Sequence, residues 1–232
     1  PSGLLTSLVI FFACNKGVCT MFIRFFFIIV LAVASTATHA SISNSNDSTI
    51  LIIGDSLSAG LGVTYNQAWP SLLQNRLKKE GYLIQVLNAG ISGDTTSGGV
   101  QRLPKLLDKH TPEIVVIELG GNDGLRGTSI KSIENNLRLM IELALNYDAK
   151  ILLAGMQLPP NYGNVYATSF QNIFPQLAIE YKIGLVERLI QRMMDDAWEQ
   201  SLMQSDGIHP NVEGHIQLEK IIWNSLKPLL EG

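Results

Sequence analysis

A serine stands where an apolar run ends, in the sequence GDSLSAG at residues 54–60. The run before it, residues 49–53, predicts a strand, so Ser56 would lie on the tight turn that leaves this strand. A serine in that place exposes its hydroxyl above the sheet, as the nucleophile of an acyl transfer requires. The same residues would also suit a helix cap or a loop that holds a phosphate, so the motif alone leaves these alternatives open.

An aspartate and a histidine lie three residues apart near the C-terminus, in DGIHP at residues 206–210. Within a single turn Asp206 could hold one imidazole nitrogen of His209 while the other nitrogen takes a proton from a serine. The pair could equally be half of a metal site or a surface turn. His215 belongs to the following helix and His110 ends another, so nothing nearby completes a metal set. We expect no metal and interpret these two histidines as structural or surface groups.

Two further loops offer hydrogen-bond donors of the kind that stabilises an oxyanion. The segment ISGDT at residues 91–95 contains Gly93, whose backbone can approach a ligand closely and donate its amide. GGND at residues 120–123 places the Asn122 side chain at the rim, and an amide is a neutral donor at every pH. Taken alone, GGND could also be an ordinary turn.

Short apolar segments alternate with longer amphipathic ones, which predicts how these residues are positioned. Strands are expected at residues 49–53, 84–88, 114–119, 150–156 and 184–186. The third segment, IVVIEL, is typical of a strand buried on both faces of a parallel sheet. Strand then helix, repeated about five times, predicts a doubly wound α/β sandwich. Ligands bind at the carboxyl ends of such strands, so the loops with Ser56, Gly93 and Asn122 should meet there, beside the loop before the last helix.

Composition excludes several classes of protein. The chain has 232 residues, 46% of them hydrophobic and 16% charged, with a mean hydropathy of +0.19 and a net charge of −3. This composition favours one globular domain over a disordered chain, and the charge provides no basic surface for nucleic acid.

The first 40 residues resemble targeting sequence more than folded protein. From Met21 a short segment with Arg24 leads into an apolar stretch and a small-residue ending, which predicts a secretory signal cleaved near Ala40. The stretch is shorter than the roughly 20 residues of a membrane span. Residues 1–20 would be an upstream extension; lipid attachment at Cys14 is an alternative that Phe11 and Phe12 disfavour. We therefore expect residues 1–40 to be removed and residues 41–232 to form a single periplasmic or secreted domain without a membrane span.

The four blocks GDSLSAG, ISGDT, GGND and DGIHP resemble those of the SGNH, or GDSL, hydrolases in order and spacing. The resemblance covers residues 49–232 and is strongest to the periplasmic thioesterase I, lysophospholipase and arylesterase group. It implies a three-layer α/β/α sandwich with a flavodoxin-like sheet of five parallel strands. It also implies that Ser56 is the nucleophile, that His209 and Asp206 complete the triad, and that the Ser56 and Gly93 amides with the Asn122 side chain form the oxyanion hole.

The resemblance further implies hydrolysis of carboxylic esters, thioesters or lysophospholipids without a cofactor, by a protein that we expect to be a monomer. Leu61, Leu158 and Pro159 flank the predicted site and are candidates for contact with the acyl chain, although they could equally be packing residues. One alternative is a carbohydrate O-acetylesterase, which would use the same triad in a polar groove. Another is a non-catalytic binding module, which would leave the coincidence of Ser56 and His209 unexplained.

Overall fold

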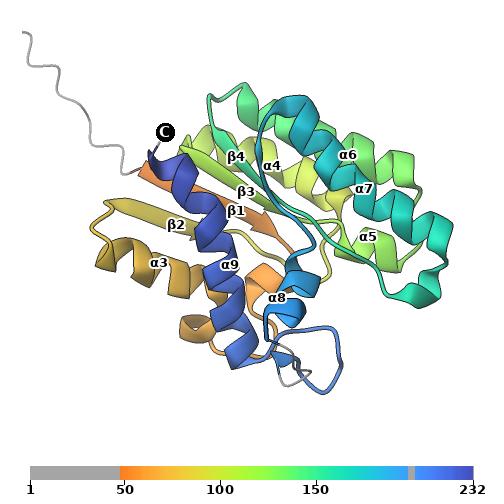
Figure 1. Ribbon diagram of the computed structural model, residues 1–232. Coiled ribbons are helices and arrows are strands. Elements are labelled where there is room, and N and C mark those ends of the chain that lie inside the picture. Colours follow the sequence, from red (N-terminus) through yellow and green to blue (C-terminus); the bar gives the residue numbers. More distant parts are fainter. Residues whose placement is uncertain (1–47, 198–201, 232) are drawn as a thin grey trace, which may run out of the picture. The chain divides into compact units, whose positions relative to one another are not determined.

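Five parallel strands form one sheet, and their bounds follow the apolar segments of the sequence. The computed structural model describes residues 48–197 and 202–231. The strands are β1 (Ser48–Gly54), β2 (Ile84–Asn88), β3 (Ile114–Glu118), β4 (Lys150–Ala154) and β5 (Gly184–Val186). They are ordered β2-β1-β3-β4-β5, and every neighbouring pair is parallel (Figure 1). The predicted α/β fold with a five-stranded parallel sheet is confirmed.

Helices follow each strand and cover both faces of the sheet. Their bounds are α2 (Ser56–Ala59), α3 (Trp69–Lys79), α4 (Thr96–His110), α5 (Gly121–Leu125), α6 (Ile130–Leu145), α7 (Asn164–Tyr181), α8 (Leu189–Ala197) and α9 (Val212–Glu231), with 3-10 turns at Tyr65–Gln67 and Pro160–Tyr162.

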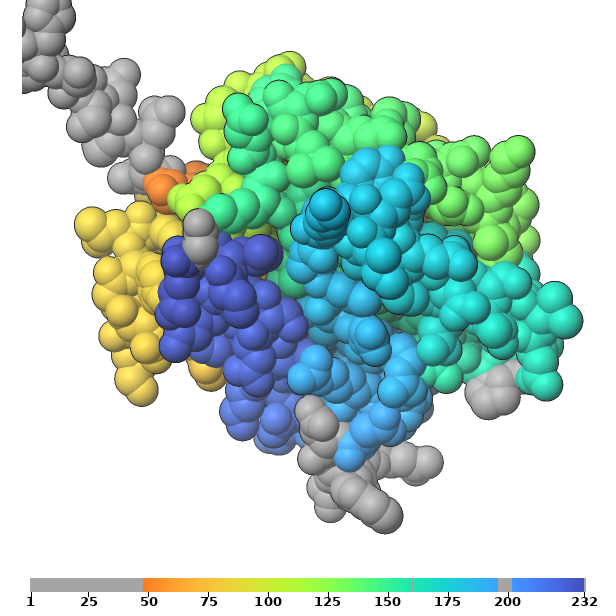
Figure 2. Space-filling view, turned by 45° about the horizontal axis from the view of Figure 1, so that its top comes forward, coloured from red at the N-terminus to blue at the C-terminus, as the bar shows by residue number. Residues whose placement is uncertain are grey.

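The strands divide the core into two layers because alternate side chains point to opposite faces. Ile50 and Ile52 of β1 pack with apolar residues of α3, α8 and α9. Leu51 and Ile53 pack with apolar residues of α4, α6 and α7. Figures 1 and 2 both show α9 beside α3 on the first of these faces. The central strands are covered on both faces, as the continuous apolar sequence of β3 predicts.

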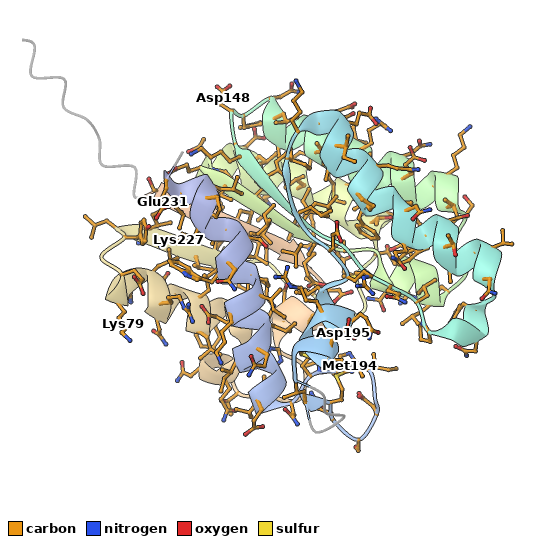
Figure 3. The ribbon with its side chains drawn as sticks, in the orientation of Figure 1. Lys79, Asp148, Met194, Asp195, Lys227 and Glu231 are labelled. Atoms are coloured by element: carbon orange, nitrogen blue, oxygen red, sulfur yellow. The ribbon has the colours of Figure 1, made fainter. Side chains whose placement is uncertain are left out.

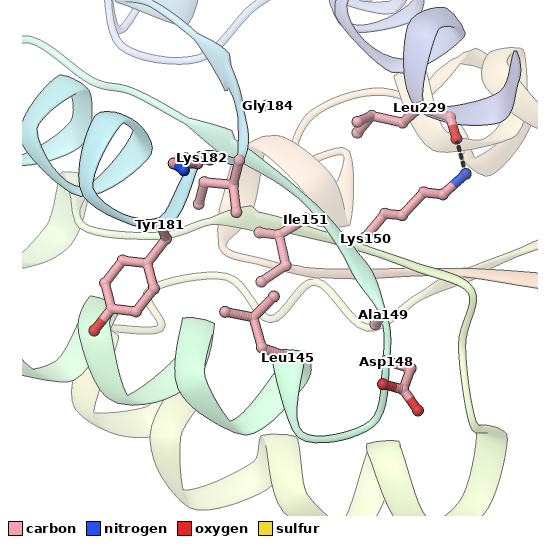
Figure 4. Close-up of a pocket in the computed structure, with 10 residues that line it drawn as sticks. Leu145, Asp148, Ala149, Lys150, Ile151, Tyr181, Lys182, Gly184 and Leu229 are labelled. Carbon is pink, nitrogen blue, oxygen red and sulfur yellow. Dashed lines mark hydrogen bonds between the residues drawn. The ribbon is translucent and has the colours of Figure 1, made fainter. Parts of the chain in front are cut away.

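A cavity of about 320 Å³ lies at the edge of the sheet where β4 and β5 begin. Its lining includes Leu145, Tyr181 and Leu229, and the Lys150 ammonium donates to the Leu229 carbonyl at 2.7 Å (Figure 4). Asp148, in the turn before β4, also lines the cavity and is labelled in Figure 3. This is the amino edge of the parallel sheet, opposite the edge where ligands bind in such folds.

The predicted leader at residues 1–40 lies outside the described residues. Across residues 48–197 and 202–231, every helix is too short or too polar to cross a membrane.

Candidate active site

The turn after β1 positions Ser56 at the carboxyl edge of the sheet. Gly54 pairs with Glu118, so β1 and β3 end side by side. Asp55 caps α2 through its Oδ1, which accepts from the Leu57 amide at 3.1 Å. Ser56 is the first residue of that helix, and its amide has no intrahelical acceptor. The chain therefore leaves the strand with a serine hydroxyl and, within residues 48–197 and 202–231, an amide without an acceptor on the same turn.

Three residues far apart in the sequence form a hydrogen-bonded chain. Ser56 Oγ lies 2.9 Å from His209 Nε2, and His209 Nδ1 lies 2.6 Å from Asp206 Oδ2. With the Nδ1 proton donated to the carboxylate, Nε2 is free to accept the serine proton. The arrangement has the geometry of a nucleophile, a general base and a group that orients the base.

The backbone of its own turn fixes the Asp206 carboxylate. Oδ1 accepts from the Ile208 amide at 2.9 Å and from the His209 amide at 3.0 Å. The hydrogen bond from the His209 backbone, followed by those from its ring and from Ile208, holds the pKa of Asp206 well below its usual range. Asp206 therefore stays ionised and keeps the proton of His209 on Nδ1.

The two predicted donors lie on loops that reach this turn. The Asn122 side chain donates to Asp55 Oδ2 at 3.0 Å. Gly93 has a positive φ of 79°, its amide is free of acceptors among the described residues, and the Arg126 guanidinium donates to its carbonyl at 3.1 Å. Asn122 and Gly93 therefore retain N–H groups for a ligand. The structure brings Ser56, His209 and Asp206 together and joins Asn122 to the residue before Ser56, whereas the hydrogen bond of Gly93 is with Arg126.

Arg102 joins the first two loops. Its Nε donates to Asp94 Oδ2 at 2.8 Å, its Nη2 to the Gly54 carbonyl at 3.0 Å, and its Nη1 to the Ala89 carbonyl. One guanidinium thus ties the strand end before Ser56 to the loop that contains Gly93.

Asp123 joins the second and third loops. Its carboxylate accepts from the Thr96 amide at 2.8 Å and from the Thr96 hydroxyl at 2.7 Å. The Asn136 side chain donates to the same hydroxyl oxygen at 3.0 Å. Asp123 therefore holds these two loops together.

Gln204 connects the histidine loop with the loop after Ser56. Its side chain donates to the Leu61 carbonyl at 2.7 Å and to the Pro210 carbonyl at 2.8 Å, and its amide donates to the His209 carbonyl at 2.7 Å. Since one loop carries His209 and the other leads away from Ser56, Gln204 links the segments that hold these two side chains.

We expect Gln204→Leu to lower kcat for a simple aryl ester about tenfold, because a small displacement of a base is enough to slow proton transfer. Steady-state kinetics of Gln204→Leu and of the control Gln191→Leu measures the effect. The Gln191 side chain hydrogen bonds only to Asp195 on α8 among the described residues. Equal rates for the two variants would contradict this role for Gln204.

The other serines near the site lack the contacts of a nucleophile. The Ser58 hydroxyl is fully buried and donates to Glu118 Oε2 at 2.6 Å. Ser92 and Ser97 are exposed. Within the described part of the chain, only the Ser56 hydroxyl contacts His209.

His215 is structural and buried. Its Nδ1 accepts from the Trp69 amide at 3.3 Å, and burial, followed by the charge of His209, lowers its pKa to about 4. His110 lies at the end of α4. In residues 48–197 and 202–231 there is no group of three His, Cys, Asp or Glu side chains that could hold a metal ion.

The low pKa of His215 predicts a loss of stability in acid. The unfolded chain binds this proton near pH 6.5 and the folded chain only near pH 4, so the free energy of unfolding falls as pH drops through that interval. In His215→Asn, whose amide oxygen can accept from Trp69, the melting temperature should fall less between about pH 7 and about pH 4.5 than in the wild type. An equal fall in the melting temperature of the variant and the wild type across that interval would contradict the prediction.

The three candidates for acyl-chain contact differ in exposure. Leu61 is 45% exposed and Pro159 is exposed, whereas Leu158 is 5% exposed and belongs to the core cluster beneath α7. Leu158 therefore offers a substrate little surface.

Sequence reasoning missed three residues that position the site, namely Glu118, Arg102 and Gln204. Glu118 carried a signal, because it is the one charged residue of a strand expected to be buried on both faces. Arg102 and Gln204 occupy ordinary polar positions, and their spacing gives no indication of their contacts.

Comparisons with known proteins agree with this geometry. Residues 52–216 match the GDSL-like Lipase/Acylhydrolase family. The chain is 47% identical to the esterase TesA of Pseudomonas aeruginosa, over 78% of this chain and 89% of that protein. It is 40% identical to the thioesterase 1/protease 1/lysophospholipase L1 of Escherichia coli K12, over 78% and 85%.

A solved structure of a psychrotrophic esterase, EstA from Pseudoalteromonas sp., inhibited by monoethylphosphonate, matches with a TM-score of 0.74 and 36% identity. The match covers 80% of this chain and all of that one. The fold, the hydrogen-bonded serine and histidine, and these matches place the chain in the GDSL-like lipase/acylhydrolase family of SGNH hydrolases.

Proposed function

We propose that the chain hydrolyses carboxylic esters and thioesters through an acyl-enzyme on Ser56. The observation that carries this proposal is the 2.9 Å contact between Ser56 Oγ and His209 Nε2, with Asp206 on the other ring nitrogen. A serine hydroxyl beside an oriented imidazole is what nucleophilic acyl transfer requires.

In the first half of the reaction, His209 Nε2 takes the Ser56 proton as Oγ attacks the acyl carbon. The carbonyl oxygen becomes an oxyanion that accepts hydrogen bonds from the Ser56 and Gly93 amides and from the Asn122 side chain. As the intermediate collapses, the bond to the alcohol or thiol breaks and the leaving group takes the proton from His209. Water then repeats the sequence on the acyl-enzyme, releases the acid and restores the Ser56 hydroxyl.

Apolar residues on four loops of the carboxyl edge favour substrates with an acyl chain. Leu61, Ile91, Val165 and Ile208 are 45%, 53%, 85% and 53% exposed. They follow β1, follow β2, lie at the start of α7 and precede His209, so each belongs to a segment that follows the carboxyl end of a strand or leads to the histidine. Relatives named as an esterase and as a thioesterase/lysophospholipase support the same range of substrates.

The test combines active-site labelling with a panel of substrates. A fluorophosphonate should modify the peptide that contains Ser56, and hydrolysis should extend from short aryl esters to acyl thioesters and lysophospholipids. Absence of labelling would contradict the serine mechanism. Activity confined to acetylated sugars would instead support the carbohydrate O-acetylesterase.

We also propose that residues 41–232 act as an exported enzyme, in the periplasm or outside the cell. The signal-like composition of residues 21–40 supports this. The N-terminal sequence of the protein recovered from the periplasmic fraction should begin near residue 41. Recovery from the cytoplasm alone, with the leader intact, would contradict export.

A further inference from the structure

Two buried acidic residues, Asp55 and Glu118, lie beneath the serine turn, where the mechanism above gives neither of them a role. The Asp55 amide donates to Glu118 Oε2 at 3.3 Å. Asp55 is 3% exposed and Glu118 is fully buried. Because Gly54 pairs with Glu118 across β1 and β3, the Glu118 carboxyl lies directly under the turn. Two buried carboxylates whose charges interact are too costly to coexist ionised, so one of them must hold a proton.

Asp55 determines which end of the Asn122 amide faces a ligand. Its Oδ2 accepts from Asn122 Nδ2 at 3.0 Å. A carboxylate oxygen only accepts, so it holds the nitrogen end of the amide and leaves the second N–H of that nitrogen for an oxyanion. An amide turned over would present its carbonyl oxygen there instead and would repel the developing charge.

The other Asp55 oxygen also accepts a hydrogen bond. An amide in place of the carboxylate would therefore set two donors against one another. Oδ1 accepts from the Leu57 amide at 3.1 Å. Asparagine at position 55 would have to direct its NH₂ group either at the Leu57 N–H or at the Asn122 NH₂. Only a group that accepts at both ends satisfies both neighbours.

Burial and mutual repulsion give the Asp55 and Glu118 carboxyl groups different protonation states. Burial, followed by the charge of Asp55, raises the pKa of Glu118 well above its usual range. Burial also raises the pKa of Asp55 to about 6, and the Leu57 amide, the charge of His209 and hydrogen bonds from Asn122 and Glu118 oppose this rise. At neutral pH Glu118 is therefore neutral and Asp55 is ionised.

The hydrogen bonds of Glu118 locate its proton. Oε2 accepts from the Ser58 hydroxyl at 2.6 Å and from the Asp55 amide at 3.3 Å. Oε1 is buried and accepts from none of the described groups. Since Oε2 already accepts twice, the proton of a neutral Glu118 belongs on Oε1.

We propose that Glu118 is a neutral acid whose Oε2 holds the Asp55 amide and the Ser58 hydroxyl, and that Glu118 and Asp55 together hold Asn122 with its N–H toward the oxyanion. Both are positioning residues, since neither touches the substrate. This inference rests on the proposed function, in which Asn122 stabilises the oxyanion.

A double-mutant cycle tests the link between Asp55 and Asn122. Asn122→Ala and Asp55→Asn should each lower kcat about 10²–10³-fold with little change in KM, because a donor is lost only where negative charge develops. If Asp55 acts through the Asn122 amide, adding Asp55→Asn to Asn122→Ala should cost less than about threefold more. If the losses of kcat in the two single variants multiply in the double variant, the positioning role of Asp55 is overturned.

Substitutions of Glu118 test its protonation state. Glu118→Gln keeps a neutral donor and an acceptor, whereas Glu118→Met removes both. Glutamine should recover most of the kcat that methionine loses, with at least about a tenfold difference between them. Equal losses would mean that an ionised Glu118 is needed, and would overturn the proposal.

Two further measurements separate failure of this inference from failure of the proposed function. In ¹³C-labelled wild-type protein the Glu118 carboxyl should have the chemical shift of a protonated acid at neutral pH, and an ionised signal there would overturn the proposal without any variant. Fluorophosphonate labelling of Ser56 with multiplying penalties would reject the positioning role alone. Absence of labelling would reject the proposed function and the role of Asn122 with it.

Discussion

Ser56→Ala should lower kcat about 10⁵–10⁶-fold while the protein stays folded and binds substrate. The substitution removes the only oxygen that His209 Nε2 contacts among the described side chains, so no acyl-enzyme can form. The donors of the oxyanion hole remain, and the residual rate would come from water attacking a bound ester, as in other serine hydrolases that lack the nucleophile. Kinetics with an aryl ester, with a melting curve to verify folding, measures the effect.

Ser97→Ala is the matched control, because Ser97 is an exposed serine on α4 that follows the second loop without contacting His209. It should keep the wild-type rate and the fluorophosphonate label, whereas Ser56→Ala should lose both. A folded Ser56→Ala protein with near wild-type hydrolysis would mean that another group is the nucleophile.

The sheet could be predicted from the sequence because its strands are buried on both faces. Ile50 to Ile53 and the IVVIEL segment leave no polar face, and this pattern suits a central parallel strand. The same pattern predicts where β1 and β3 end, and hence that their loops meet at one edge. Strand order lies beyond such reasoning, since the sequence alone does not specify that β1 pairs with both β2 and β3.

The residues of the proposed triad could be named from the sequence, whereas most of the residues that hold them could not. Ser56, His209 and Asp206 stand in short motifs whose spacing is set by one turn of backbone. Arg102 and Gln204 act through backbone carbonyls of distant loops, and any carbonyl can accept, so sequence carries no mark of these pairings. Glu118 is intermediate, because a charge in a buried strand predicts a special environment without naming Asp55 as its partner.

Asp206→Asn should lower kcat about 10⁴-fold, because the backbone forces the new amide into the wrong orientation. Asp206 Oδ1 accepts from the Ile208 and His209 amides, so asparagine must place its carbonyl oxygen there. Its NH₂ group is then directed at His209 Nδ1, which must become the acceptor. The ring proton moves to Nε2, where it faces Ser56 Oγ and prevents the imidazole from taking the serine proton.

The tautomer of His209 provides a readout that loss of stability would not produce. In ¹⁵N spectra the wild type should carry its ring proton on Nδ1 and Asp206→Asn on Nε2. Asp195→Asn, which changes an exposed aspartate on α8 that accepts from Gln191, should keep both the rate and the wild-type tautomer. An Asp206→Asn protein that retains the Nδ1 proton, or more than about a tenth of the wild-type kcat, would mean that Asp206 does not govern the base. The Asp206 carboxylate holds the His209 ring and two backbone amides at once, so its charge and its geometry both act on the ring proton of His209. Asp206→Asn alters the charge while leaving the turn in place.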